Sequence, residues 1–147
     1  MGTYLPLDSG SVAIPGWRVS RGGIDLVVYW QSYDGSRSID LNGTPGPGGI
    51  EQTIRTVPGQ TYQIRFALAG NPEGPPAIKT MRVSAGNQSA QFTFDVTGRT
   101  IRAMGWTRHS WSFTAVDTVS TIEFFSLDPE VGLYGPALDQ VSIIRVN

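Results

Sequence analysis

The chain has 147 residues, the ordinary size of one domain, a formal net charge of −1 and no cysteine. This charge balance excludes the basic surface of a nucleic-acid binder and the polybasic face of a membrane-surface protein, and the missing cysteines exclude disulfides and thiolate catalysis. Only 16% of the residues are charged, and 18 glycines and 10 prolines interrupt the chain, which favours many short strands joined by turns.

The first eleven residues show no regular pattern, so we expect an irregular N-terminal arm over residues 1–11 and a single β-sandwich domain over residues 12–147. Beyond the arm, apolar and polar residues alternate with a period of two, as in strands that bury one face. Ile64, Phe66 and Leu68, for example, share a face of one such segment. The predicted strands are residues 12–19, 24–30, 37–42, 50–56, 61–69, 78–84, 88–95, 108–115, 119–126 and 137–146.

Turn sequences rich in Gly, Asn and Asp separate these segments, and no apolar stripe with the period of a helix lasts beyond two turns. About ten strands exceed what an open sheet usually holds without curling or splitting. The sequence therefore predicts an all-β fold, an antiparallel β-sandwich of the jelly-roll type.

Catalytic chemistry has few candidates in this sequence. His109 is the single histidine, and its strand parity with Trp111 and Phe113 predicts a partly buried, hydrogen-bonded residue at the edge of the core. No Gly-x-Ser-x-Gly sequence accompanies it, as a nucleophile elbow would require. A glycosidase needs only two facing carboxylates, but eight Asp and four Glu among ten strands produce such spacings by chance. We therefore expect no enzyme activity.

Aromatic residues in or beside the predicted loops are better candidates for ligand contact than those with inward strand parity. They are Tyr29, Trp30, Tyr33, Trp106 and Tyr134, and polar residues flank them. A sugar ring offers apolar C–H faces for stacking and hydroxyls for planar polar side chains, so these positions favour a glycan ligand. A structural alternative stays open, in which the same rings cap the ends of the sandwich.

Six motifs in order carry a family resemblance: Ile14-Pro15-Gly16-Trp17-Arg18-Val19, Tyr29-Trp30-Gln31, Asp34 to Gly43, Phe66 to Pro72, Met104-Gly105-Trp106-Thr107, and Tyr134 to Val141. In order and spacing the chain resembles the choice-of-anchor C family of bacterial secreted proteins and the related plant cell-wall domains of previously unknown function. The resemblance implies a galactose-binding-like jelly roll, usually non-catalytic and associated with polysaccharide or the cell surface. The candidate glycan contacts are the motif positions Trp30, Asp34, Arg37, Asn71, Trp106 and Tyr134, together with the loop residue Tyr33.

The same resemblance implies one metal candidate. Members of the family often hold a structural calcium between the Asp of the last strand, here Asp139, and an acidic residue of an N-terminal Asn-Gly-x-Phe-Glu strand. This chain starts at Met1 beyond the place of that strand, and it shows no signal peptide. Of the two acidic positions that hold the ion in the family, Asp139 is the one found in this sequence. It is the candidate for a calcium site, and no other cofactor is predicted.

Two non-enzymatic functions stay open at this point. The first is a carbohydrate-binding or cell-surface adhesion module, whose partner is a polysaccharide or another glycan. The second is a structural virion protein, such as a phage capsid decoration (cement) or tail-fibre module, because a secreted-type domain without a signal can reach the exterior by lysis. Its partners would be other virion or surface proteins, with a homo-oligomer left open. Both place the chain outside the cell or on a virion surface, with no nucleic-acid or membrane partner.

Overall fold

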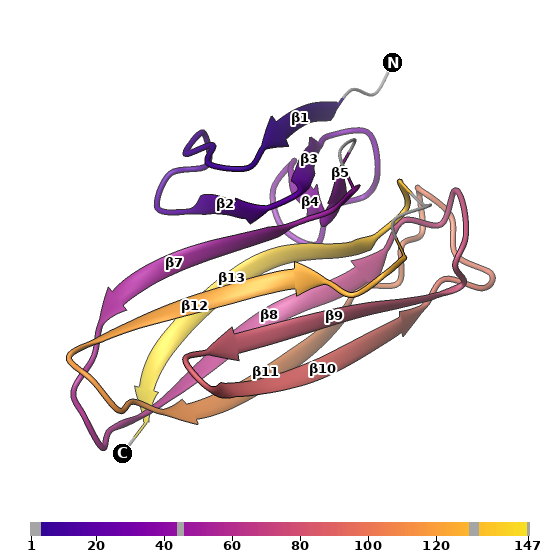
Figure 1. Ribbon diagram of the computed structural model, residues 1–147. Helices are drawn as coiled ribbons and strands as arrows, with labels where there is room; N and C mark the ends of the chain where they lie inside the picture. The colour runs from indigo at the N-terminus through magenta and orange to yellow at the C-terminus, as the bar shows by residue number, and fades with distance from the viewer. Residues whose placement is uncertain (1–3, 44–45, 130–132, 147) are drawn as a thin grey trace.

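The computed structural model describes residues 4–43, 46–129 and 133–146, and within these ranges it contains strands and no helix (Figure 1). The strands are β1 (Tyr4–Asp8), β2 (Arg18–Arg21), β3 (Gly23–Val27), β4 (Ser38–Asp40), β5 (Asn42–Gly43), β6 (Gly46–Pro47), β7 (Gly49–Arg55), β8 (Thr61–Gly70), β9 (Ile78–Ala85), β10 (Gln88–Asp95), β11 (Thr107–Thr114), β12 (Val119–Ser126) and β13 (Pro136–Val146). No helix in the described part is long and apolar enough to cross a membrane.

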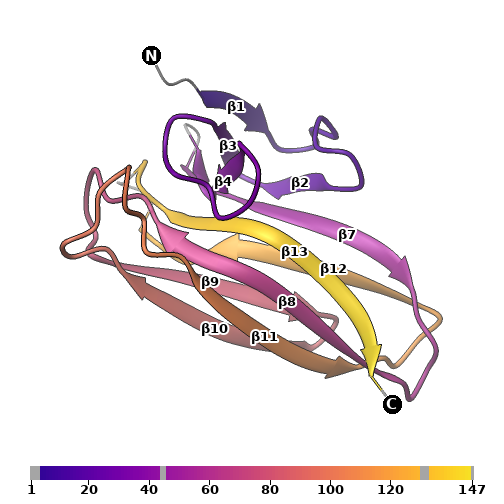
Figure 2. The same cartoon turned by 180° about the vertical axis from the view of Figure 1, so that it is seen from behind.

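Two antiparallel sheets form the layers of the sandwich. The six-stranded sheet has the order β1-β3-β4-β13-β8-β11, and the five-stranded sheet has the order β10-β9-β12-β7-β2. A short ribbon of β5 and β6 stands beside them. Figure 1 looks onto β12, β9 and β10 of the five-stranded sheet, and Figure 2 looks onto β13, β8 and β11 of the six-stranded sheet. The predicted all-β antiparallel sandwich is thus confirmed.

The core lies between the two sheets, where the alternating apolar residues of both meet. Ile64, Phe66 and Leu68 of β8 are fully buried, and the Phe66 ring contacts the rings of Phe92 and Phe124 from the opposite sheet at centroid distances of 5.1 and 5.4 Å. Aromatic contacts of this kind join the layers through the most buried part of the molecule.

His109 lies at the margin of this core, as predicted. Its ring stacks on Phe66 at a centroid distance of 5.7 Å, its Nε2 is 2.9 Å from Thr107 Oγ1, and partial burial lowers its pKa. The single histidine therefore packs as part of the sandwich, and it lies in none of the hollows described below.

The N-terminal segment differs from the expected irregular arm. Residues 4–8 are strand β1, which pairs in full with β3 and buries Leu7 opposite Ile24, while residues 1–3 lie outside the described ranges. Pro6 interrupts the strand pattern in the sequence. Proline is tolerated here because β1 is the edge strand of its sheet, where a missing N–H donor leaves no neighbouring strand unpaired. The next predicted strand also begins later, at Arg18, because residues 11–17 form a loop that contains Pro15 and a Gly16 with positive φ.

Candidate functional site

The loop between β3 and β4 folds over the outer face of the six-stranded sheet, and Asp139 of β13 fixes it there. Oδ2 of Asp139 accepts hydrogen bonds from the backbone N–H groups of Tyr33 at 2.9 Å and Asp34 at 3.0 Å, and Oδ1 accepts one from Gln140 at 2.7 Å. A β-bulge between Asp139 and Ser142, with Gln140 at a φ of 46°, turns this part of β13 toward the loop. The carboxylate thereby holds Tyr33 above the sheet.

Tyr33 presents an aromatic ring to solvent at this place, with 39% of its surface exposed. The guanidinium of Arg108, on β11, lies 5.5 Å from the ring centroid. Its Nη1 donates to the hydroxyl of Tyr33 at 3.3 Å and to Oε1 of Gln140 at 3.1 Å. An exposed ring bordered by an arginine and an amide has the side-chain types that stack on a sugar and pair with its hydroxyls.

A hollow of about 450 Å³ continues from Tyr33 toward Trp106. Its lining consists of Gln31, Ser32, Tyr33, Arg99, Ala103, Gly105 and Trp106. Gln31 ties the two sides together, since its carbonyl accepts the indole N–H of Trp106 at 2.8 Å and its side-chain oxygen accepts the N–H of Met104 at 2.9 Å. Gly105 has a φ of 73°, a conformation that favours glycine, and this turn brings the chain against the side chain of Arg99.

Two of the predicted glycan contacts lie in the interior instead. Trp30 is only 3% exposed, and its indole N–H donates to Ser38 Oγ. Asn71 is 4% exposed, and it donates to Asp40 Oδ2 at 2.9 Å while accepting the N–H of Glu73 at 3.0 Å. Both side chains hold neighbouring segments together. Because they are buried, they are not available to a glycan at the surface.

The remaining predicted positions are divided over the molecule. Asp34 is exposed in the same loop as Tyr33. Tyr134 packs against Gly74, where a Cβ would lie 2.2 Å from its ring, and Arg37 lines a separate pocket. The structure thus brings Tyr33, Asp34 and Trp106 to one region and leaves Arg37 and Tyr134 outside it.

Sequence reasoning missed Arg108 and Gln140, which complete the cluster around Tyr33. Arg108 has outward strand parity on β11, and this is a weak signal because most exposed strand residues have no ligand. Gln140 reaches the cluster through the bulge in β13, which no local pattern indicated.

The expected calcium at Asp139 does not fit the donors found there. Both oxygens of this carboxylate already accept backbone N–H groups. In the part of the chain that the structure describes, no three or more His, Cys, Asp or Glu side chains gather as a metal ion would require. With both oxygens of Asp139 engaged and no such cluster among the described residues, the acidic side chains present do not fit a calcium ion, which takes six to eight oxygen ligands.

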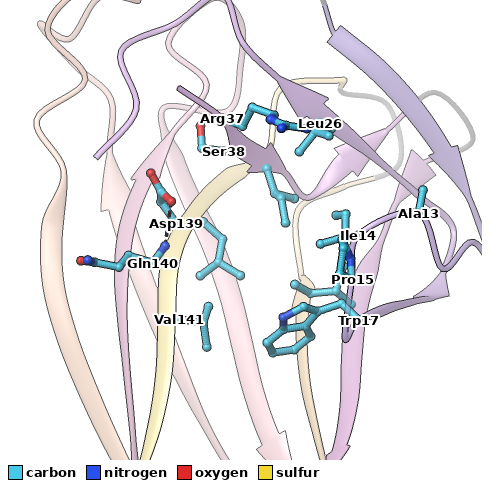
Figure 3. Close-up of a pocket in the computed structure, with 13 residues that line it drawn as sticks. Ala13, Ile14, Pro15, Trp17, Leu26, Arg37, Ser38, Asp139, Gln140 and Val141 are labelled. Atoms are coloured by element: carbon cyan, nitrogen blue, oxygen red, sulfur yellow. Dashed lines mark hydrogen bonds between the residues drawn. The ribbon is translucent and has the colours of Figure 1, made fainter. Parts of the chain in front are cut away.

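A second, more apolar pocket of about 340 Å³ lies on the other side of β13 (Figure 3). Figure 3 shows Trp17 and Ile14 across from Val141, with Asp139 and Gln140 pointing away from Trp17. Trp17 also packs on Phe124 at a centroid distance of 6.0 Å, so its ring belongs partly to the core. The pocket is therefore a gap in the side of the sandwich that adjoins the cluster around Tyr33 through Asp139 and Gln140.

A pair of carboxyls lies on neighbouring strands of the six-stranded sheet, with Asp40 buried and Asp25 partly buried. Asp25 of β3 faces Asp40 of β4 across the sheet. Burial raises the pKa of Asp40 to about 7 and that of Asp25 to about 6. The oxygens of Asp40 accept hydrogen bonds from Asn42 N, Asn71 Nδ2 and Gly135 N. Since neither carboxyl lines a described hollow, the pair has no place for a glycoside between its members.

The fold is that of known carbohydrate-binding modules. It is similar to the CBM22-1 xylan-binding domain from Paenibacillus barcinonensis, with a TM-score of 0.64, 17% identity and coverage of 99% of this chain and 96% of that one. It is also similar to a family 35 carbohydrate-binding module from Clostridium thermocellum, with a TM-score of 0.61, 15% identity and coverage of 97% and 99%. At these identities the likeness establishes the architecture.

The profile of the family described as "Protein of unknown function (DUF642)" matches residues 3–144, and the chain belongs to this family. It is 36% identical over 144 residues to halomucin of Haloquadratum walsbyi, and 29% identical over 159 residues to the Arabidopsis thaliana protein DUF642 L-galactono-1,4-lactone-responsive gene 2. The alignments cover 97% and 99% of this chain but only 2% and 41% of those relatives. The predicted kinship with the plant domains is confirmed, and that with the choice-of-anchor C family stays a prediction.

Proposed function

We propose that the chain is a non-enzymatic carbohydrate-binding module that acts outside the cell. The observation that carries this proposal is the half-exposed ring of Tyr33, bordered on one side by Arg108 and Gln140 and on the other by the hollow that ends at Trp106. The architecture shared with carbohydrate-binding modules agrees with it.

The site acts by stacking and hydrogen bonding. One sugar ring lies on Tyr33, Arg108 and Gln140 pair with its hydroxyls, and the chain continues over the hollow toward Trp106. The residues that line this hollow include no carboxylate, and Asp34 beside it faces no second free carboxylate there, so we propose binding without cleavage.

Affinity electrophoresis in gels that contain xylan, β-1,4-galactan or alginate tests the site. We expect retention by at least one polymer, and we expect Tyr33→Ala or Trp106→Ala to weaken it about tenfold, which corresponds to about 1.4 kcal/mol of stacking. Tyr4→Ala is the matched control, because Tyr4 is 55% exposed on β1, which β3 and β4 separate from β13 in the sheet.

Retention that both site variants leave unchanged would place the sugar elsewhere, and no retention by any polymer in a broad glycan panel would contradict the proposal. Turnover of a bound polymer would contradict its non-enzymatic part. The structural virion protein stays a prediction that none of the observations above supports.

A further inference from the structure

Some arginines on the outer faces of the sandwich pair with a carboxylate and others do not, and Arg55 and Arg82 of the five-stranded sheet form no ion pair with another described residue. On the five-stranded sheet, Arg18 forms an ion pair with Glu51 at 3.3 Å, and Arg21 binds both carboxylate oxygens of Glu123 at 2.8 Å. These guanidinium groups are neutralised within the protein.

On the outer face of the six-stranded sheet, Arg65 and Arg108 have only neutral acceptors among the described residues. Nε of Arg65 donates to Oε1 of Gln63 at 2.8 Å, and Arg108 donates to the Tyr33 hydroxyl and to Gln140. The carboxylate of Asp139 is occupied by backbone N–H groups. Each guanidinium has five N–H donors, so each keeps donors for an external group.

The strand register leaves both arginines uncovered. Arg108 of β11 stands opposite Ala67, and Arg65 of β8 stands between Ser110 of β11 and Ser142 of β13. These neighbours are too short to cover a guanidinium, and both arginines are exposed. Diagonal positions on adjacent strands lie about 7–8 Å apart, so the two arginines start from neighbouring positions of β8 and β11, where Arg108 contacts Tyr33 and Arg65 bends toward Gln63.

We propose that the glycan bound at this face is acidic, a polysaccharide of uronate residues whose carboxylates pair with Arg65 and Arg108 while a sugar ring lies on Tyr33. The proposal rests on the proposed function and specifies its ligand class. The free N–H donors of the two arginines favour an anionic group, and the planar fork of arginine matches a carboxylate with two parallel hydrogen bonds. The carboxylates of Asp34 and Asp139 belong to the same region, so the preference for an anion rests on the free guanidinium donors and not on a net positive charge.

The test compares one polymer with and without its charges. Titration calorimetry measures the binding of the full chain to alginate and to the same alginate with its carboxyl groups reduced to alcohols. Both polymers are tested at about 20 and about 300 mM NaCl. We expect the reduced polymer to bind at least tenfold more weakly, and salt to weaken only the binding of the charged form. Arg65→Gln with Arg108→Gln should remove this preference. Arg18→Gln with Arg21→Gln, which changes the net charge equally on the opposite face, should keep it.

Each of the following outcomes would overturn the proposal. Equal binding of charged and reduced alginate would mean that the ligand is a neutral glycan, and so would retention by xylan or galactan alone. Either result would leave the proposed function intact. An equal loss in the Arg18/Arg21 control would reduce the effect to net charge. Equally tight binding of dextran sulfate would show a site for any polyanion. Failure of every polymer to bind would contradict the proposed function itself.

Discussion

Asp40 is a carboxyl group inside the protein, and its burial is tolerated because three donors surround it. Asn42 and Gly135 donate backbone N–H groups to Oδ1, and Asn71 donates its amide to Oδ2. Desolvation still outweighs these hydrogen bonds and raises the pKa to about 7, with a further contribution from Asp25. The amide of Asn71, predicted from sequence as a ligand contact, is thus used in the interior.

The raised pKa of Asp40 predicts that the protein loses stability as the pH rises through 7. Between its unfolded value of 3.8 and its folded value of about 7, the folded chain holds the proton more tightly than the unfolded chain does. We expect unfolding in urea to require about 1 kcal/mol less free energy at pH 8.5 than at pH 6.5. His109, whose pKa burial lowers from its ordinary value of 6.5, adds stability as the pH rises past 6.5 and so offsets part of the loss from Asp40.

The control for the pH dependence is a pair of matched variants. Asp40→Asn should flatten the dependence between pH 6.5 and 8.5. Asp95→Asn should leave it, because hydrogen bonds from Thr97 lower the pKa of that exposed carboxyl away from the interval. A urea midpoint that rises with pH in the wild-type chain would contradict the assignment to Asp40.

Among the elements, β9 joins two connecting segments to the core through Lys79. The side chain is fully buried, and its Nζ donates to the carbonyl of Gly74 at 2.8 Å and to that of Tyr134 at 2.7 Å. Burial lowers the pKa of Lys79, and Asp128 and Asp40 oppose that shift. One ammonium therefore holds the connection before β9 against the segment before β13, and Gly74 allows the ring of Tyr134 to lie on it.

Lys79→Met should destabilise the protein by about 3 kcal/mol, because it keeps the apolar stem but leaves two partly buried carbonyls without this donor. Urea unfolding measures the loss, and hydrogen exchange should become faster in residues 71–77 and 133–135. Arg102→Met serves as the control, since it removes an exposed cation. A loss below about 0.5 kcal/mol, the usual range for surface substitutions, would show that the two carbonyls do not depend on Lys79.

At the scale of the whole molecule, one apolar cluster connects both sheets. It extends from Leu7 of β1 to Leu138 of β13 and includes Met81 and Ile122 of the opposite layer. On one side the amide of Gln88 also joins β10 to β11 by accepting the N–H of Thr114 and donating to its carbonyl. The other side is open at the pocket beside Trp17.

This shared core predicts that the chain unfolds as one cooperative unit, which is the expectation of a single sandwich domain. Differential scanning calorimetry should show one transition, with a calorimetric enthalpy of about 100 kcal/mol near 60 °C that equals the van't Hoff value. The reason is that neither sheet can keep its inner face buried once the other is lost. Two separable transitions would contradict a single domain.

The regular strands were predictable from sequence because alternation is a local property. Predicted strands 61–69, 78–84, 88–95 and 119–126 match β8, β9, β10 and β12 to within a residue at each end. The alternation of apolar and polar residues did not predict the structure of segments that depend on a partner strand or on turn residues. Residues 4–8 become a strand only because β3 lies beside them, and residues 12–17 bend away because of Pro15 and Gly16.

The sequence by itself determined the all-β class, the strands of the core and the kind of residue that can bind a sugar, because each follows from composition or from neighbours along the chain. Only the tertiary structure decided which candidates are surface residues. Trp30 and Tyr33 stand three positions apart in one loop, yet one is buried on Ser38 and the other is exposed beside Arg108. That difference depends on strands β11 and β13, far away in the sequence, whose register and bulge place Arg108 and Asp139 under the loop.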